Sequence, residues 1–449
     1  MKKIFIIGAG RSATDLIEYL LNHAEENDWE ITVGDYSEAL AREKTGNHPR
    51  GKAIFFDATN PVSRRFYISS SSLVVSFLPP QMHVLIARDC LEHGSHLVTA
   101  SYLSAEIAAM DEAVKQKGLI FLNEMGADPG IDHMSAMQNI DAIRAKGGEI
   151  VAFKSYCGAL VAPESNDNPW GYKFTWSPMN VIVAGQNTAR FIDKGKLRYI
   201  PYQRLFTSTE KIKVPGMGTF EAYANRDSLA YREKYGLSDL PTMFRATLRY
   251  PGFCEVWAAL VKVGLTDPGY SLPDSENLTY RQWVSAYISE AEEKGLEQAL
   301  ADYLNTTLDS EVMNRLKWAG LFSEEKIARK NGTPAEILLD LLLNKLSFRQ
   351  NDTDMLVMVD YFEYKQDGKI FARSSSLVTK GLDPRHTAIS RTVGLPAAIG
   401  VKLILQEKIK ARGVMLPLSS EIYSPVLQEL ENWGISFVET ETEITTPEK

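Results

Sequence analysis

The first 125 residues alternate short apolar stretches with stretches in which apolar residues recur every three or four positions. Short apolar stretches predict buried strands, and the helical spacing predicts amphipathic helices. The predicted strands are Ile4–Ile7, Glu30–Val33, Ala53–Phe56, Leu73–Phe77, His96–Thr99 and Leu119–Leu122, and the predicted helices are 13–24, 82–92 and 104–117. This alternation predicts an α/β fold in which helices cover both faces of a doubly wound parallel sheet.

The pattern changes after residue 130. It predicts another helix at 131–145, a strand at 150–156, and a mostly helical stretch over 252–346 that includes 279–299 and 334–346. Two strands, 355–364 and 370–375, flank Gln366-Asp367-Gly368, a sequence typical of a hairpin turn. The last 60 residues predict a helix (397–409), a strand (414–416), a helix (426–433) and a strand (435–439). A tail with this pattern could return to the first sheet.

Composition narrows the class of protein. The 449 residues are 44 % hydrophobic and 24 % charged, which is typical of a globular protein of two or three domains. The net charge of −8 disfavours nucleic-acid binding. Three cysteines disfavour a disulfide framework and favour a cytoplasmic location. No uninterrupted apolar run approaches the roughly 18–20 residues of a membrane span, and the apolar stretch Ile4–Ile7 is too short for a signal peptide.

The first predicted strand runs into Gly8-Ala9-Gly10-Arg11-Ser12-Ala13, which opens the first predicted helix. This G-x-G-x-x-A order is a form of the dinucleotide-binding fingerprint. Gly8 permits the tight turn, Gly10 lets a pyrophosphate approach the backbone, and Ala13 allows the helix to pack closely on the strand. A tight turn without a phosphate is the alternative.

Two acids follow later strands of this sheet. Asp35 ends the second strand 25 residues after Gly10, near the spacing of the acid that accepts the ribose hydroxyls of NAD. Asp57 follows the third strand and either faces the adenine edge or is a surface turn residue. Because ligands bind outside the carboxyl ends of parallel strands, the segments 76–80, 99–102 and 126–130 are also placed at the crevice.

Other catalytic signatures are missing from the sequence. The seven histidines form no H-x-x-x-H pair, and Cys90, Cys157 and Cys254 are far apart, so no metal site is predicted. There is neither a P-loop nor a G-x-S-x-G nucleophile elbow.

Eight further segments of the chain, taken in order, form a specific sequence pattern. They are 98–102 (VTASY), 123–133 (NEMGADPGIDH), 155–158 (SYCG), 162–164 (APE), 168–177 (NPWGYKFTWS), 225–228 (NRDS), 247–253 (TLRYPGF) and 316–323 (LKWAGLFS). In this order they resemble the saccharopine dehydrogenase family, and within it the L-glutamate-forming branch. The resemblance extends from residue 3 to about residue 440.

The resemblance implies a fold and an activity. It implies a variant Rossmann domain (1–130, completed by about 390–449), a mixed α/β substrate and dimerisation domain (131–250 and 347–389) and a helical insertion (251–346). It implies an enzyme that oxidises saccharopine with NAD or NADP and water to L-glutamate and 2-aminoadipate 6-semialdehyde, or runs the reverse condensation, in lysine metabolism. A homodimer is expected, with no nucleic-acid or membrane partner.

The motifs also imply site residues. Implied cofactor contacts are Gly8, Ala9, Gly10, Arg11, Ser12, Asp35, Asp57, Ala58, Leu78, Ala100, Ser101, Ala127, Asp128, Pro129 and Ser177. Implied substrate contacts are Ser101, Tyr102, Asp128, Cys157, Arg226, Thr247, Leu248 and Arg249. Saccharopine carries three carboxylates, and the planar guanidinium group of arginine suits carboxylate binding.

The sequence departs from the family at one informative place. NADP-using fungal members carry a Cys-Arg-Thr-like triplet after the second strand, whereas this chain has Asp35-Tyr36-Ser37. The arginine that could pair with the 2′-phosphate is absent from this triplet and an anion is present, which favours NAD over NADP. Arg42 and Lys44 lie downstream and could still reach a phosphate.

The reaction needs a group that can exchange a proton, and Asp128 and Tyr102 are the predicted catalytic residues. Asp128 could instead cap the helix that begins near residue 131, and Tyr102 could be a packing residue. His133 is expected to be structural, and Cys157 is expected to act as a small hydrophobe rather than a nucleophile.

Two other functions remain open. A carboxynorspermidine synthase-like reductive condensation would need acids where the carboxylates of saccharopine need cations. A non-catalytic dinucleotide-binding sensor would need neither the Asp128 loop nor the two arginine motifs.

Overall fold

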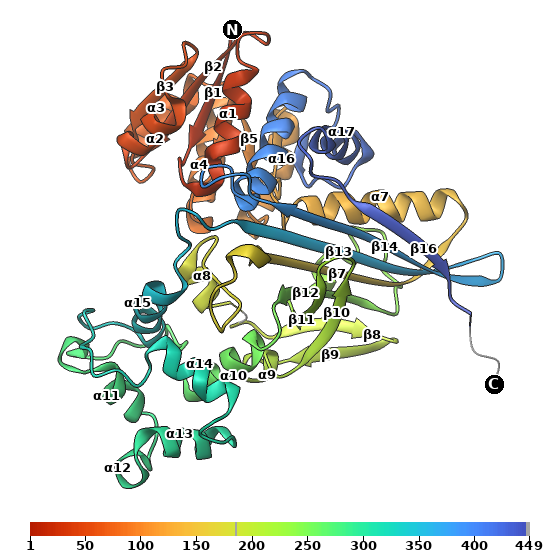
Figure 1. The fold of residues 1–449 in the computed structure, drawn as a ribbon. Coiled ribbons are helices and arrows are strands. Elements are labelled where there is room, and N and C mark those ends of the chain that lie inside the picture. The colour runs from red at the N-terminus through yellow and green to blue at the C-terminus, as the bar shows by residue number, and fades with distance from the viewer. Residues whose placement is uncertain (185, 446–449) are drawn as a thin grey trace. The chain divides into compact units, whose positions relative to one another are not determined.

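The computed structural model describes residues 1–184 and 186–445 (Figure 1). The chain divides into two compact units, the first formed by Met1–Ile150 with Phe362–Lys449 and the second by Val151–Tyr361. The first unit is thus discontinuous in sequence, and the second is an insertion between its two parts. The domain boundaries implied by the resemblance stay predictions.

The first unit contains a seven-stranded sheet in the order β15-β6-β5-β4-β1-β2-β3. Its strands are β1 (Lys2–Ile7), β2 (Trp29–Asp35), β3 (Gly51–Phe55), β4 (Leu73–Ser76), β5 (His96–Thr99), β6 (Ile120–Leu122) and β15 (Gly413–Met415). All neighbours pair in parallel. The first six follow the doubly wound order 3-2-1-4-5-6, so the topological switch point, where dinucleotides bind, lies between β1 and β4. The predicted fold class is confirmed.

Helices flank this sheet, and several differ from the predictions. Between the strands lie a 3-10 turn (Arg11–Ala13), α1 (Thr14–Asn22), α2 (Glu38–Thr45), α3 (Pro61–Ser69), a 3-10 turn (Pro80–Met82), α4 (His83–His93), α5 (Ala105–Ala108), α6 (Asp111–Gln116) and α7 (Ile131–Ala145). The pattern missed α2 and α3 because they have few buried residues. The single helix predicted over 104–117 is wrong, since the structure breaks it into α5 and α6.

The C-terminal tail packs on the first unit. Strand β15 pairs with β6, and helix α16 (Ala388–Leu405), blue in Figure 1, lies beside the red helix α1. A Cβ at Gly394 would come within 2.8 Å of the backbone nitrogen of Leu16, so glycine permits this close packing. Helix α17 (Ser420–Glu431) contacts α7, and β16 (Val438–Glu443) pairs with β14 (Lys369–Lys380). The predicted bounds of these tail elements were wrong, because α16 and α17 begin earlier and β16 later than expected.

The second unit combines strands with a group of helices. Its strands are β7 (Glu149–Val161, which begins in the first unit), β8 (Ala189–Asp193), β9 (Lys196–Ile200), β10 (Thr209–Val214), β11 (Gly218–Ala224), β12 (Met243–Arg249) and β13 (Asp354–Gln366, which ends in the first unit). Strand β12 pairs in parallel with β7 and antiparallel with β11, which makes the sheet mixed. The helices are α8 (Pro178–Ile182), α9 (Tyr202–Leu205), α10 (Phe253–Val263), α11 (Tyr280–Ser285), α12 (Ala291–Lys294), α13 (Leu296–Leu304), α14 (Glu311–Ala319) and α15 (Pro334–Leu346).

Two local predictions in this region have different outcomes. The long helix expected over 279–299 is wrong, because that stretch contains α11, α12 and the start of α13. The turn at Asp367-Gly368 joins β13 (Asp354–Gln366) to β14, and both of its residues have positive φ, 48° and 76°. Such a pair of left-handed residues is typical of a tight hairpin, so this prediction is confirmed.

Candidate functional site

The glycine turn after β1 has the geometry that a dinucleotide site requires. Gly8 has φ +104°, and a Cβ there would lie 2.7 Å from the carbonyl oxygen of Phe77, so a larger residue does not fit. A Cβ at Gly10, in contrast, would meet nothing within 4 Å. The space above Gly10 is therefore open to a ligand, as close approach of a pyrophosphate demands. Arg11 and Ser12 continue the turn as its 3-10 segment.

Asp35, at the end of β2, is joined to this turn. One carboxylate oxygen accepts a hydrogen bond from the backbone N–H of Ala9 at 2.8 Å, and the other accepts one from Ser37 N–H at 2.8 Å. The carboxylate therefore fixes the glycine turn to the end of β2. Sequence spacing predicted this acid as a ribose contact but did not reveal the hydrogen bond to Ala9.

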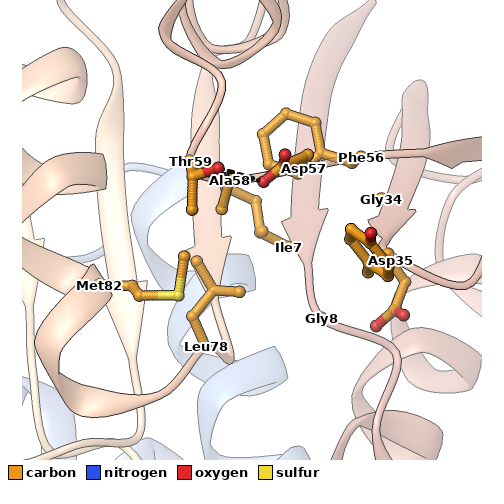
Figure 2. A pocket seen from close by; sticks show the side chains of 11 residues that line it. Ile7, Gly8, Gly34, Asp35, Phe56, Asp57, Ala58, Thr59, Leu78 and Met82 are labelled. Carbon is orange, nitrogen blue, oxygen red and sulfur yellow. Dashed lines mark hydrogen bonds between the residues drawn. The ribbon is translucent and has the colours of Figure 1, made fainter.

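A cavity of about 390 Å³ opens beside these residues (Figure 2). Figure 2 shows Asp35 on one side and Leu78 and Met82 on the other. The lining residues are Ile7, Gly8, Gly34, Asp35, Tyr36, Phe56, Asp57, Ala58, Thr59, Leu78 and Met82. The carboxyl ends of β1, β2 and β3 thus meet here, as the switch-point rule requires. Among these described residues there are two acids and no lysine or arginine.

Asp57 is turned back on its own loop. Its carboxylate accepts hydrogen bonds from the backbone N–H of Thr59 at 2.8 Å and from the Thr59 hydroxyl at 2.7 Å, and these bonds lower its pKa. The side chain forms a turn and also lines the cavity, and its contact with an adenine stays a prediction.

The two cations downstream of β2 are engaged outside the cavity lining. The guanidinium of Arg42 lies 2.5 Å from the carboxylate of Glu38, one helical turn away on α2. The ammonium of Lys44 donates to the hydroxyl of Thr14 at 2.8 Å. Neither residue lines the cavity next to Asp35.

The loops after β5 and β6 are held against each other. The backbone N–H of Met125 donates to Thr99 O at 3.0 Å, and that of Glu124 donates to Ser101 O at 3.2 Å. These bonds bring Ala100 and Ser101 next to the segment with Ala127, Asp128 and Pro129. The hydroxyl of Tyr102 donates to the carboxylate of Asp128 at 2.9 Å, so the two predicted catalytic side chains are in direct contact.

Two buried groups behind these loops, Glu124 and His83, were not recognised from the sequence. Glu124, with φ 60° and 1 % exposure, accepts from Leu103 N–H at 2.9 Å and contacts His133 Nε2 at 2.8 Å. His133 is fully buried, and its contact with Glu124 joins it to the loop. His83 lies 2.8 Å from the Ser76 hydroxyl and 2.7 Å from the Ser101 hydroxyl.

In the second unit, Arg249 at the end of β12 is a buried cation with 3 % exposure. Its guanidinium lies 5.2 Å from the ring centres of Tyr172 and Phe253 and 5.6 Å from that of Tyr223. It donates to Leu248 O at 2.8 Å and to the Tyr223 hydroxyl at 3.3 Å, while Nε has no hydrogen-bond partner. Within the described residues the guanidinium forms no ion pair with a carboxylate. A buried guanidinium without a carboxylate partner is suited to bind an anionic group of a ligand.

The other predicted substrate residues of this unit lie on β7, β11, β12 and the segments after them. Thr247 pairs with Cys157 on β7 and with Tyr223 on β11. Arg226 has φ 47°, a left-handed conformation, and its carbonyl accepts from Arg190 N–H at 2.9 Å. The side chain of Arg190 also pairs with Asp227 at 2.5 Å, so Arg190 contacts both Arg226 and the residue after it. Ser177 is the residue that precedes α8.

Two other features bear on the class of protein. Within residues 1–184 and 186–445, no group of three or more His, Cys, Asp or Glu side chains could hold a metal ion. Helix α16 is long and apolar enough to cross a membrane, with mean hydropathy 1.5, but 83 % of it is buried inside the protein. A helix that is buried to this extent has the character of a core helix.

Two family models match the chain. The saccharopine dehydrogenase NADP binding domain matches residues 4–122, and the saccharopine dehydrogenase C-terminal domain matches residues 126–435. The chain belongs to the saccharopine dehydrogenase family. The predicted family and its oxidoreductase class are confirmed.

Individual members of the family extend this finding. The chain is 32 % identical to the Schizosaccharomyces pombe saccharopine dehydrogenase [NADP(+), L-glutamate-forming] over 98 % of its own length and 99 % of that protein. It is 31 % identical to an Arabidopsis thaliana alpha-aminoadipic semialdehyde synthase, of which it spans 44 %. The apo saccharopine dehydrogenase (L-Glu forming) of Saccharomyces cerevisiae superposes with a TM-score of 0.88 at 29 % identity, covering 98 % of this chain and all of that one.

A more distant structure shares the fold alone. The homospermidine synthase of Legionella pneumophila in complex with NAD has a TM-score of 0.58 at 10 % identity, covering 98 % of this chain and 91 % of that one. The individual contacts predicted for cofactor and substrate stay predictions, although the structure places them in two groups, one in each unit.

Proposed function

We propose that this member of the saccharopine dehydrogenase family is an L-glutamate-forming saccharopine dehydrogenase. Hydride passes from the carbon that becomes the aldehyde to the nicotinamide, and the secondary amine becomes an imine. Water adds to the imine carbon, and the resulting carbinolamine releases L-glutamate and 2-aminoadipate 6-semialdehyde. The reverse sequence is a reductive condensation of the same two compounds.

The buried guanidinium of Arg249 is the observation that carries this proposal. The aromatic rings of Tyr172, Tyr223 and Phe253 surround it, and no carboxylate of the described chain neutralises it. A carboxylate of the substrate would supply the missing counter-charge and accept a hydrogen bond from Nε. This need favours an acidic substrate over the diamine of a carboxynorspermidine synthase-like reaction.

Tyr102 and Asp128 are the proposed proton-transfer pair. Their hydrogen bond of 2.9 Å lets the tyrosine hydroxyl pass a proton to the carboxylate as it accepts another. A non-catalytic sensor would have no use for such a pair next to a dinucleotide crevice.

We further propose that NAD is preferred over NADP. The Asp35 carboxylate lines the cavity, where it would accept hydrogen bonds from ribose hydroxyls, and the described lining residues include no lysine or arginine. Arg42 and Lys44 are bonded to Glu38 and Thr14 instead. The names of the fungal relatives specify NADP(+), so the cofactor preference is where this chain is expected to differ from them.

An absorbance assay at about 340 nm, with saccharopine and each cofactor in turn, tests both proposals. We expect saccharopine-dependent formation of NADH and a higher kcat/KM with NAD than with NADP. No reaction with saccharopine, together with reaction of a diamine and a semialdehyde, would support the alternative condensation. Cofactor binding without turnover of either substrate would support the sensor.

A homodimeric state and a cytoplasmic location are also proposed. The location rests on the three cysteines, which are all free in the structure. Light scattering coupled to size exclusion tests the first, with a mass of about twice the 50.2 kDa chain expected. Fluorescence microscopy of the tagged chain tests the second.

A further inference from the structure

A chain of three hydrogen-bonded side chains runs behind the cofactor crevice of the first unit. The Ser76 hydroxyl at the end of β4 lies 2.8 Å from Nδ1 of His83, and the Ser101 hydroxyl after β5 lies 2.7 Å from Nε2. Ser76 is 0 % and His83 3 % exposed. Ser101 lies on the loop after β5, and the family motif implies it as a contact of both cofactor and substrate.

The position of His83 makes this link rigid. The residue begins α4 directly after the 3-10 turn Pro80–Met82, at the carboxyl end of β4. Its ring therefore bridges the ends of two neighbouring strands, β4 and β5, which pair from Leu73 to Ser76. Because both ring nitrogens are engaged, the ring cannot turn without breaking a buried hydrogen bond.

The ring is also uncharged at neutral pH. Burial lowers the pKa of His83 to about 4, because desolvation penalises the imidazolium form. A neutral imidazole has one donor and one acceptor nitrogen. Whichever tautomer is present, Nε2 has a single role in its hydrogen bond, and this bond holds the Ser101 oxygen in place.

We infer that His83 is a positioning residue that fixes the Ser101 hydroxyl for the hydride-transfer reaction. This inference rests on the proposed saccharopine dehydrogenase activity. His83 exchanges no proton with the substrate and acts through Ser101, while Ser76 holds the far side of its ring. A preset hydroxyl costs no reorientation when the ligand binds, which improves the geometry of the reacting groups.

Two substitutions of His83 test the hydrogen bonds of its two ring nitrogens separately. In His83→Gln the longer amide can reach the Ser101 hydroxyl, as Nε2 does, whereas in His83→Asn the amide replaces only the contact of Nδ1 with Ser76. We expect kcat with saccharopine to fall about tenfold in His83→Asn and by less than about threefold in His83→Gln. His96→Asn is the matched control. His96 is another partly buried histidine of this unit, its Nδ1 accepts from Ile120 N–H at 3.0 Å, and its substitution should leave kcat unchanged.

The double variants identify the partner through which His83 acts. In a Ser101→Ala background, His83→Asn should cause no further loss, since the hydroxyl that it positions is gone. Equal activity of wild type, His83→Asn and His83→Gln would overturn the inference, as would an undiminished His83→Asn effect in the Ser101→Ala background. If His83→Asn fails to fold, Ser76→Ala replaces it, because losing the far hydrogen bond should also lower kcat only when Ser101 is intact.

If the proposed saccharopine dehydrogenase activity is wrong, the result differs from the one that would overturn the inference about His83. In that case wild type itself shows no saccharopine-dependent activity. The positioning of Ser101 is then read from NADH binding by fluorescence, where His83→Asn should weaken affinity and His83→Gln should not. Equal affinities of these variants and wild type would then overturn the inference.

Discussion

The carboxylate of Asp35 accepts a hydrogen bond from the backbone N–H of Ala9 at 2.8 Å. The residue expected to select the cofactor thus also shapes the glycine turn that is predicted to bind the pyrophosphate. A substitution at this position consequently has two effects, one on the ribose and one on the turn, and the choice of variant must separate them.

Asp35→Asn retains an oxygen that can accept from Ala9 but removes the negative charge. Losing a charged acceptor for ribose hydroxyls should raise the KM for NAD about tenfold. The KM for NADP should fall or stay constant, because the repulsion of the 2′-phosphate is removed. Steady-state kinetics with both cofactors measure this. Asp57→Asn serves as the comparison, since it should change both KM values by similar factors. An unchanged ratio in Asp35→Asn would contradict the role.

Arg249→Met should weaken saccharopine binding strongly without affecting the cofactor. Removing the buried cation deprives a substrate carboxylate of its partner, which should lower kcat/KM about a hundredfold or more. Arg249→Lys should recover little, because an ammonium cannot replace the planar guanidinium group. NADH binding by fluorescence should stay normal. Full activity in Arg249→Met would exclude this residue from the substrate site, and the same assay applied to Arg226→Ala tests the second arginine.

Tyr102→Phe removes the hydroxyl bonded to Asp128 without changing the ring. If the pair transfers protons, kcat should fall about a hundredfold and the pH dependence of kcat should change shape. Asp128→Asn should have at least as large an effect, while both proteins melt like wild type. A rise in KM with kcat unchanged would instead identify Tyr102 as a group that binds the substrate.

Lys173 is the most deeply buried lysine described, with 0 % exposure, and its ammonium lies 2.6 Å from Asp352 and 2.9 Å from Asp167. Lys173→Met leaves Asp352 buried without its cation, which should cost about 3–5 kcal/mol of stability. Arg349→Ala removes a 65 % exposed partner of the same Asp167 and should cost less than about 1 kcal/mol. Thermal unfolding of both variants provides the comparison, and equal melting temperatures would refute it.

The lowered pKa of His96 is expected to make the folded protein less stable as the pH falls. Burial lowers the pKa of His96 to about 4 from 6.5, and the charges of Arg412 and Lys2 act in the same direction. The folded protein therefore takes up a proton less readily than the unfolded chain. Stability that is present above pH 6.5 is lost as the pH falls toward 4. The melting temperature of wild type should thus fall more steeply than that of His96→Asn between about pH 7 and pH 5. Parallel curves would contradict this.

Local sequence was sufficient to predict the elements proposed to bind the cofactor. The turn from Gly8 to Ala13 and the acid at Asp35 could be predicted because glycine conformation and strand length act over a few residues. Helices α2 and α3 were missed because they lie on the surface and bury few side chains, which weakens their apolar periodicity. The split of α5 from α6 was missed because both segments keep helical spacing across the break.

By itself the sequence determined the family, the parallel α/β fold, the glycine turn and the acids and arginines that the reaction calls for. Only the tertiary structure decided how they are combined. It places the carboxylate of Asp35 on the turn, His83 between two serines, and Arg249 among rings that come from three segments. The physical reason is that these contacts join residues far apart in the chain. Their distances are set by the packing of strands and helices, and no local spacing encodes them.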